Sequence, residues 1–543
     1  MLYTLYNSLD AVLLELKATL TTIVGQLTTS QASLFSIELH ELPNSLLLRL
    51  SFIWAAMPLF RTPSQALCLL RRRQSYFHKA NRICVPPYSC IQGPHATQPR
   101  RRCLSTSTAR EEANEAASPR IAIVGGGPAG LTLGFLLHKR GIPFTIFELR
   151  PKPSDEELAK PSGMLDLHDE SGLAALRECG VFDKFLGLTG ECTEAQKVAD
   201  KDGNIIYRDE GELSERPEIA RHALTQLLSS HLPEGAIKYG HRLLSAATRT
   251  SDSSVAAQQI ELDFAGDSGS HNRKQKQAFD LVIGADGAWS KVRNMLTDVK
   301  PYYAGTQNLT VTIQQVTAKY PHLSDLVGRG SFSALGLRHG VMSHRGPNDS
   351  ARIYVMLSVE DEQFAASSGF TERKTTAKEA KHRFLDDNAL LGAWGPQLKE
   401  LVSVACDEET ADNPGSAVDI KPLYMLPIGA SWEHKTGATI IGDAAHLMCP
   451  WAGEGVNLAM WDALLLARVI TQAHSIATGT GNKDTAASFQ RVLAPLLEDF
   501  ETQMVARAKE KAEETYSSGQ MMFSDDAANA FARFFRSVNA MEK

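Results

Sequence analysis

The chain has 543 residues, enough for a large core and more than one domain, and its 43% hydrophobic and 22% charged residues are typical of globular proteins. Its formal net charge of −6 argues against a nucleic-acid binder, which would carry a strong basic surplus. The eight cysteines are too few for a disulfide scaffold and form no CxxC pair, which argues against zinc and thioredoxin chemistry and indicates a reduced intracellular setting.

The first 118 residues differ in composition from the rest. No Asp or Glu occurs from Leu42 to Arg110, a stretch with two arginine triplets that is typical of an organelle transit peptide. Acidic residues before it do not fit that interpretation, but translation from Met57 would remove them. A mitochondrial precursor, a disordered basic linker and a wrongly placed gene start all stay open. No segment reaches the roughly 20 strongly apolar residues of a spanning helix, so we do not expect membrane association.

The body begins with a glycine-rich loop between a strand and a helix. An apolar strand is expected at 121–124 and a helix at 129–140, and the intervening residues fit GxGxxG. In such loops Gly125 permits the tight turn, Gly127 lets the backbone approach a pyrophosphate, and Gly130 lets the helix pack on the strand. The helix start then offers free N–H groups to the phosphates.

An acidic residue completes this first pattern. A second strand is expected at 144–147 and ends at Glu148, 18 residues after Gly130. An acid at this spacing accepts hydrogen bonds from the adenosine ribose. The sequence therefore predicts a dinucleotide site, but this motif alone does not separate NAD from FAD.

Two further turns follow predicted strands. Residues 281–283 lead into Asp286-Gly287, for which an ordinary β-turn is the alternative, and residues 439–441 lead into Gly442-Asp443. The turn Pro450–Asn457 then opens an apolar helix from Leu458 onward. A carboxylate after a strand can bind a polyol, and a helix start can stabilise the negative charge of a reduced flavin ring.

In this order, the three motifs resemble those of the single-component flavoprotein monooxygenases typified by para-hydroxybenzoate hydroxylase, over residues 121 to about 470. A closer resemblance is to the tetracycline-inactivating monooxygenases of that group. It is carried by Gly163-Met164-Leu165-Asp166-Leu167-His168, Pro217-Glu218-Ile219-Ala220-Arg221 and Gly442-Asp443-Ala444-Ala445-His446-Leu447-Met448.

The resemblance implies a role for each matching residue. Glu148 and Arg150 would hold the adenosine part of FAD, Asp166 would contact FAD near the substrate, and Arg221 would reach the pyrophosphate or ribitol. Asp286 would lie between FAD and the nicotinamide route, Asp443 would bind the ribitol, and Pro450 and Gly453 would border the flavin ring. The complete predicted cofactor set is Gly125, Gly127, Ala129, Gly130, Glu148, Arg150, Asp166, Arg221, Asp286, Gly442, Asp443, Pro450 and Gly453.

This sequence also departs from the closer group. A Gln and an Arg that grip the polyketide there are replaced by Thr310 and the Phe332–Ser333 region, so tetracycline is not assigned as the substrate. We expect structural roles for His168 and His446 and simple packing for Cys449. Trp451 is open between core packing and facing the flavin or substrate. No metal site and no general base are named.

We therefore expect an α/β fold. A Rossmann-type FAD-binding domain (119–295 and 433–484) follows the leader 1–118, a mostly antiparallel substrate domain covers 296–432, and a C-terminal segment 485–543 carries a bracing helix at about 488–516.

The expected protein is an FAD-dependent monooxygenase that uses NADPH or NADH and O2 on an aromatic or polyketide-like small molecule in secondary metabolism. A monomer, cytoplasmic or mitochondrial, is expected. The alternatives are a mitochondrial quinone-ring hydroxylase, a flavin-dependent reductase or dehydrogenase without oxygen insertion, and a non-catalytic FAD-binding regulator.

Overall fold

The computed structural model describes residues 118–160, 162–189, 195–211, 217–249, 258–265, 275–370, 375–479 and 485–542. All of them belong to one compact unit, Leu104–Lys543. The other unit, Met1–Cys103, lies outside the described residues. The predictions of a transit peptide and of a start at Met57 therefore fall outside them too.

A parallel sheet forms the first layer of the described unit. Its five strands have the order β17-β11-β1-β2-β7, and each neighbouring pair is parallel. All four residues of β1 are buried, as expected for a central strand of a parallel sheet that is covered on both faces. The strands are β1 Ile121–Val124, β2 Thr145–Phe147, β7 Ile237–Lys238, β11 Leu281–Gly284 and β17 Ala438–Ile440.

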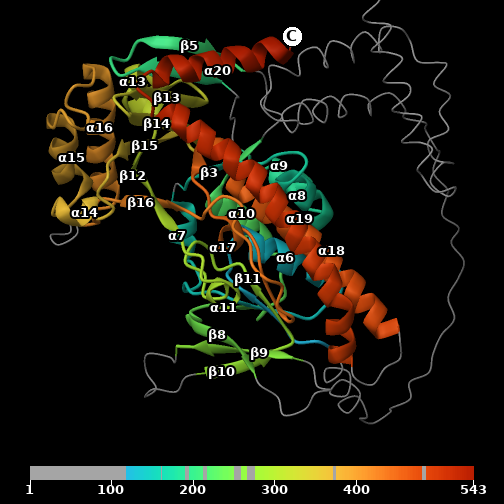
Figure 1. Cartoon of the computed structure of the whole chain (residues 1–543). Helices are drawn as coiled ribbons and strands as arrows, with labels where there is room; N and C mark the ends of the chain where they lie inside the picture. The colour runs from blue at the N-terminus through green and yellow to red at the C-terminus, as the bar shows by residue number, and fades with distance from the viewer. Residues whose placement is uncertain are drawn as a thin grey trace, which may run out of the picture. The chain divides into compact units, whose positions relative to one another are not determined.

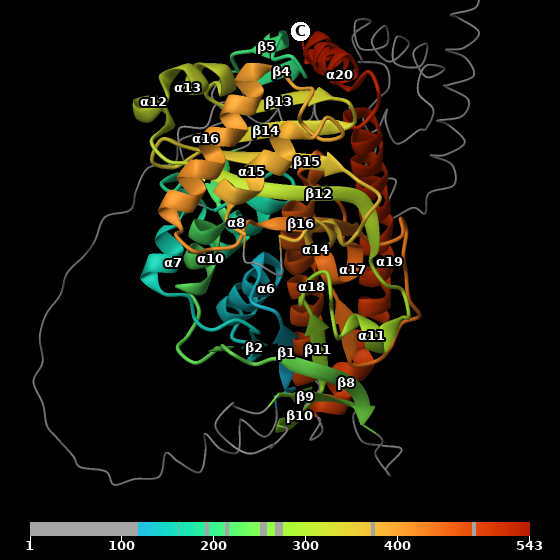
Figure 2. The same ribbon diagram turned by 90° about the vertical axis from the view of Figure 1, so that its left-hand side faces the viewer.

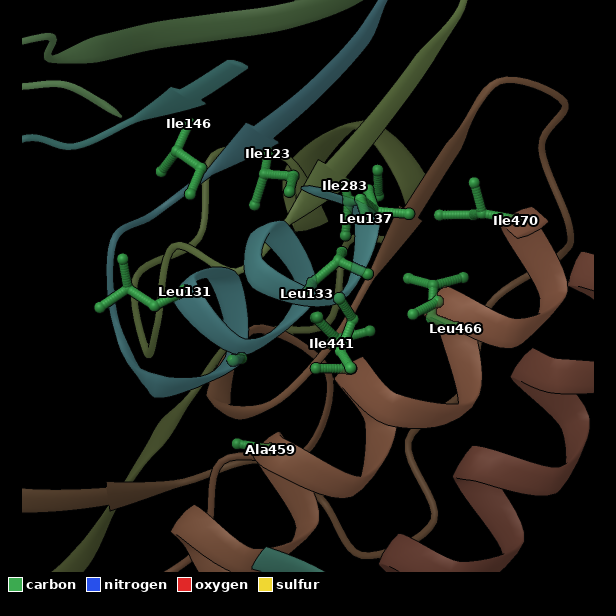
Figure 3. Close-up of a cluster of buried hydrophobic side chains, with 14 of the residues drawn as sticks. Ile123, Leu131, Leu133, Leu137, Ile146, Ile283, Ile441, Ala459, Leu466 and Ile470 are labelled. Atoms are coloured by element: carbon green, nitrogen blue, oxygen red, sulfur yellow. The ribbon is translucent and has the colours of Figure 1, made fainter. Parts of the chain in front are cut away.

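Two apolar helices pack against this sheet. Helix α6 (Pro128–Lys139) begins with a proline at its first position, which presets the helical φ angle, and α18 (Glu454–Gly479) packs beside it. Figure 3 shows the resulting core, in which strand, α6 and α18 side chains meet: Ile123, Ile283, Leu133, Leu137, Leu466 and Ile470. Each such fully buried side chain contributes roughly 1.5–3 kcal/mol of transfer free energy.

A second sheet of seven strands has the order β16-β12-β15-β14-β13-β4-β5 among the described residues. Its neighbours are antiparallel except β4 and β13. Two of its strands, β4 and β5, come from the segment 119–295 rather than from 296–432. The strands are β4 Gln196–Asp200, β5 Ile205–Asp209, β12 Tyr302–Ile313, β13 Ser331–Gly336, β14 His339–Gly346, β15 Ser350–Ser358 and β16 Ile420–Met425.

The two faces of this sheet have different partners. Helices α15 (Ala377–Asp386) and α16 (Pro396–Asp412) cover one face, as Figure 2 shows. Because side chains alternate along a strand, Ile353 and Val355 of β15 pack under these helices while Tyr354 points to the other face. The two sheets confirm the predicted α/β fold with a second, mostly antiparallel layer.

The remaining elements are short or peripheral. A small antiparallel pair joins β3 and β6, and a three-stranded sheet has the order β10-β9-β8. Their bounds are β3 Met164–Asp166, β6 Glu218–Ala220, β8 Leu243–Arg249, β9 Gln259–Phe264 and β10 Gln275–Phe279. The other helices are α7 Asp155–Ala159, α8 Gly172–Cys179, α9 Phe182–Leu186, α10 Arg221–Ser229, α11 Arg293–Leu296, α12 Val316–Lys319, α13 Pro321–Val327, α14 Phe364–Ser367, α17 Asp443–His446 and η4 Pro450–Ala452.

The predicted bracing helix is present and longer than expected. Helix α19 spans Thr485–Met522, with Pro495 inside it, and contacts α17, η4 and α18 before the chain turns into α20 (Ala527–Glu542). Figures 1 and 2 both show α19 running past the parallel sheet toward the second sheet, where α20 lies against β4 and β5. Among the described helices, none is long and apolar enough to cross a membrane.

The three cysteines with described positions are buried free thiols: Cys179, Cys406 and Cys449. Burial raises the pKa of each to about 12, so they are unreactive near neutral pH. This agrees with the packing role expected for Cys449.

Candidate flavin and substrate site

Two glycines of the first loop are required by backbone contacts. Gly125 has a φ of +112°, and a Cβ atom there would lie 2.1 Å from the Ala285 carbonyl oxygen. A Cβ atom on Gly130 would lie 2.0 Å from the carbonyl oxygen of Gly125. The loop can therefore fold against β11 and α6 only with glycine at both positions.

The third glycine faces open space. Gly127 is the N-cap of α6, and a Cβ atom placed on it would meet no atom within 4 Å. Its neighbour Ala129 is buried. The start of α6 thus leaves room for a ligand beside free backbone N–H groups, which suits a phosphate.

The carboxylate of Glu148 closes this loop from β2. Its Oε2 accepts a hydrogen bond of 2.7 Å from the Gly126 N–H, and its Oε1 accepts bonds of 2.9 and 2.8 Å from the backbone N–H and the side chain of Arg150. Burial alone would raise the pKa of Glu148, but these bonds from Arg150 and Gly126 hold it below the ordinary value. Glu148 is therefore a fixed anion beside the glycine loop.

Asp286 is engaged by its own turn. Its Oδ1 accepts a hydrogen bond of 2.5 Å from the Ser290 hydroxyl, and its Oδ2 accepts one of 2.7 Å from the Lys291 N–H. Burial raises the pKa of Asp286 despite these bonds. Its carboxylate thus stabilises the turn after β11, in line with the β-turn alternative, while the role toward the nicotinamide route stays a prediction.

Arg293 links the second and third motifs, which the sequence alone did not indicate. Its side chain is buried and donates hydrogen bonds of 3.0 Å to the Ala444 carbonyl and 2.5 Å to the Ala288 carbonyl. It lies seven residues after Asp286, between Val292 and Asn294 and close to Lys291, so nothing in the local sequence sets it apart. The side chain fixes the two strand-end turns relative to each other.

The third motif places Asp443 at the start of α17. Gly442 has a φ of +60°, and a Cβ atom there would lie 3.5 Å from the Cβ of Ala129 and 3.1 Å from that of Ala459. This brings the third motif against the first. The Asp443 side chain is solvent-accessible although protein surrounds it closely, and this desolvation raises its pKa in spite of the charges of His446 and Arg221.

His446 has the structural role expected of it. Its Nε2 lies 2.6 Å from an Asp462 oxygen, and the same oxygen accepts a 3.1 Å hydrogen bond from the Gly442 N–H. Burial would lower the pKa of His446, but Asp462 raises it above the ordinary value. Asp462 was missed in the sequence because it stands on an otherwise apolar helix.

The third part of the site is the turn before α18. Gly453 has a φ of +68°, and a Cβ atom there would lie 2.9 Å from an Asp166 carboxylate oxygen, while Pro450 is exposed beside it. A Cβ atom on Gly455 would meet nothing within 4 Å, so the start of α18 faces open space. Asn457, also missed, is fully buried and donates hydrogen bonds to the carbonyls of Asp166 (2.9 Å) and Gly453 (3.2 Å).

Arg221 reaches this line of residues from α10. Its backbone N–H donates a 3.0 Å hydrogen bond to the Gly163 carbonyl, because β3 and β6 pair next to it. Its side chain is exposed and its charge acts on both Asp443 and Tyr354. Among the described residues, the side chains of Asp443 and Arg221 have no hydrogen-bond partner.

These features fit an extended dinucleotide. Two open helix starts, at Gly127 and Gly455, and two unpaired charged side chains, at Asp443 and Arg221, line one route from the Glu148 anion to the Asp166 carboxylate. Phosphates suit the first helix start, a polyol suits the carboxylate, and an electron-rich ring suits the second helix start.

The second sheet presents a row of side chains toward this route. Thr310, Tyr354, Met342 and Ser333 are direct cross-strand partners on four neighbouring strands, and therefore share one face. The Tyr354 hydroxyl lies 3.4 Å from the Cβ position of Gly163. Phe332, by contrast, packs in the core on the helix-covered face.

Trp451 borders the same space. Its ring meets that of Phe523 edge-on at 5.0 Å, and both half-buried rings pack against a buried cluster that includes Met342 and Met356. Trp451 therefore packs against the core from the flavin-side turn, and a role toward the flavin or substrate stays a prediction.

Comparison with known proteins identifies the ligand. The family model described as "FAD binding domain" matches residues 119–391 and 430–498. Monooxygenase asqM of Emericella nidulans is 31% identical over 76% of this chain and 97% of its own length. Monooxygenase penA of Penicillium thymicola is 32% identical over 77% of this chain and 98% of its own.

Solved structures agree on the fold. Klebsiella pneumoniae HpxO, complexed with FAD and uric acid, matches with a TM-score of 0.55 at 16% identity, over 78% of this chain and 95% of its own. Tetracycline destructases are also among the matching structures, at TM-scores of 0.49 and 0.48.

Proposed function

The chain belongs to the FAD-binding-domain family and is an FAD-dependent monooxygenase, and we propose that its substrate is an electron-rich aromatic or polyketide-like small molecule of secondary metabolism. One observation carries the substrate proposal. The row Thr310–Tyr354–Met342–Ser333 combines hydroxyl groups with a thioether, and its Tyr354 hydroxyl lies 3.4 Å from the Cβ position of Gly163, beside the strand that carries Asp166. Such a surface suits a flat ring that carries polar substituents.

The cofactor residues divide by position. We assign the glycine loop, Ala129, Glu148 and Arg150 to the adenosine diphosphate half, Arg221, Gly442 and Asp443 to the pyrophosphate and ribitol, and Asp166, Pro450 and Gly453 to the ring end. Asp286 holds the loop at the nicotinamide side in this assignment. When bound and reduced by NADPH or NADH, FAD supplies the oxygen-transfer chemistry with O2.

The protein's own contribution is position, charge and the exclusion of water. The start of α18 directs backbone N–H groups and a positive dipole end at the place assigned to the ring, which stabilises negative charge there. The apolar cluster around Trp451 and Met356 keeps the substrate side dry. The monomeric state and a cytoplasmic or mitochondrial compartment belong to the same proposal.

The direct test uses the purified protein. It should be yellow, and a substrate from a panel of phenolic and polyketide compounds should speed its oxidation of NADPH or NADH and acquire oxygen-18 from labelled O2. Faster NADPH oxidation without label in the product would indicate a reductase. If only quinone-like compounds acquire oxygen-18, the quinone-ring hydroxylase is favoured. A colourless protein that rejects added FAD would refute the proposal.

A further inference from the structure

A line of charged side chains leads from the ring end of the site to helix α19. An Asp166 carboxylate oxygen lies 3.0 Å from Nε2 of His168, whose Nδ1 lies 3.6 Å from a Glu454 oxygen. The other Glu454 oxygen accepts a 2.6 Å hydrogen bond from the Lys511 ammonium group. Consecutive groups are thus within or close to hydrogen-bond distance, on three separate parts of the chain.

The ends of this line reach solvent and its middle does not. The side chains of Asp166 and Lys511 are 34% and 23% exposed, whereas those of His168 and Glu454 are 4% and 7% exposed. Lys511 also lies 3.2 Å from Glu514, whose side chain is 54% exposed. The line therefore connects the flavin side with the outer surface of α19 through the interior.

Asn457 holds the inner half in place. Its side-chain oxygen accepts a 2.8 Å hydrogen bond from the His168 N–H, and its amide group donates to the Asp166 carbonyl. The same oxygen lies 3.3 Å from the Ser171 hydroxyl. Asn457 therefore fixes the backbones of both Asp166 and His168, and proton transfer between their side chains would need no large motion.

The imidazole of His168 lies between acidic groups. The ionisable groups that face it include Asp166 from β3 and Glu454 from α18, with Lys511 and Glu514 of α19 behind Glu454. Burial would raise the pKa of Glu454, but its contacts with His168 and Lys511 hold it below the ordinary value. His168 thus stands between two carboxylates, each of which can exchange a proton with the imidazole.

We propose that His168 relays protons between the Asp166 carboxylate at the flavin site and the Glu454–Lys511 pair at α19. The proposal rests on the proposed function, because each monooxygenase turnover consumes one proton: RH + NADPH + H⁺ + O2 gives ROH + NADP⁺ + H2O. Asp166 releases a proton into the site, the His168 imidazolium protonates Asp166 again, and His168 regains its proton from solvent through Glu454. No electrons move along this line.

The test compares His168→Gln with the wild-type holoenzyme. Product formation should fall about 100-fold, the range of a lost acid–base group, and it should depend less on pH than product formation by the wild type. An equilibrium readout accompanies it. The midpoint potential of bound FAD should vary less with pH in the variant, because the negative charge of the reduced ring favours protonation of a nearby imidazole and the variant has no such group. An unchanged pH profile together with an unchanged potential would overturn the relay.

Two further variants guard against a merely structural effect. Glu454→Gln keeps the side-chain shape and interrupts the line one step further out, so it must weaken the same pH dependence even if His168→Gln fails to bind FAD. His382→Gln changes a side chain on α15 that is 74% exposed, and it should change neither readout. A wild-type protein that incorporates no oxygen-18 would refute the proposed function instead, whatever the His168 variant does.

Discussion

The two sheets of the molecule encode their functions in different ways. In the parallel sheet, the three cofactor motifs and Glu148 follow strands β1, β2, β11 and β17 directly and meet at one edge, because the carboxyl ends of parallel strands coincide. In the seven-stranded sheet, the row facing the substrate side takes single residues from the middle of long strands. In the first sheet, the functional residues lie in short sequence motifs at strand ends. In the second sheet, they are far apart in the sequence and come together through the strand register.

The largest expected effect is at the first sheet. Gly130→Ala would place a Cβ atom 2.0 Å from a backbone oxygen that cannot move freely, so unfolding should become easier by about 3 kcal/mol and FAD binding should be lost. Thermal or urea unfolding of the apoprotein measures this. Gly479→Ala, where the Cβ would meet nothing within 4 Å, is the matched control. Equal stability of both variants would contradict the close helix–strand contact.

Arg293→Met should have the next largest effect. It removes two hydrogen bonds to buried carbonyls and so should cost about 2 kcal/mol of stability, with a weaker affinity for FAD because two strand-end turns lose their link. Denaturant unfolding and FAD titration by fluorescence check both parts. Arg533→Met on α20, whose side chain is 62% exposed, serves as the control.

The Asp443→Ala substitution should change FAD binding without changing the stability of the fold. Its carboxylate has no hydrogen-bond partner among the described residues, so the apoprotein should keep its stability, while FAD affinity should fall about 10-fold to 100-fold. Flavin fluorescence titration measures the affinity. Wild-type affinity in the variant would refute the ribitol assignment.

Glu148→Gln gives a smaller effect that depends on pH. Since the folded-state pKa of Glu148 is lowered, its carboxylate stabilises the fold above the ordinary value of 4.5 and this contribution is lost as pH falls through the folded-state value. The variant should therefore be less stable than the wild type at pH 7, and the gap should close in acid. Melting temperatures of the two apoproteins across this pH range provide the check. A difference in melting temperature that stays the same at every pH would argue against an ionised Glu148 carboxylate.

The smallest effect should come from the second sheet. Tyr354→Phe keeps the ring and removes a hydroxyl on the substrate-facing row, so FAD affinity should stay the same while KM for the substrate rises a few-fold. Steady-state kinetics with the identified substrate measure it. If FAD affinity fell instead, the row would belong to the cofactor, and the contrast between the sheets would be wrong.

The same contrast explains what the sequence revealed. The glycine loop, Glu148 and Gly442-Asp443 were visible because each lies within a few residues of an apolar strand. Arg293, Asn457 and Asp462 each act on at least one partner 20 to about 290 residues away, so only the folded chain shows these links. The row through Thr310 and Ser333 depends on strand register, and β4 and β5 join a sheet whose other strands lie about 100 residues later.

Helix α19 has a consequence for synthesis of the protein. It follows every other element of the flavin site in the chain, yet it supplies Lys511 to Glu454, and its Arg507 lies 3.6 Å from the buried Asp462. On the ribosome the earlier elements therefore emerge before these carboxylates can gain their partners on α19. A chain cut short before Thr485 would lack both basic side chains and should be less stable than the full chain.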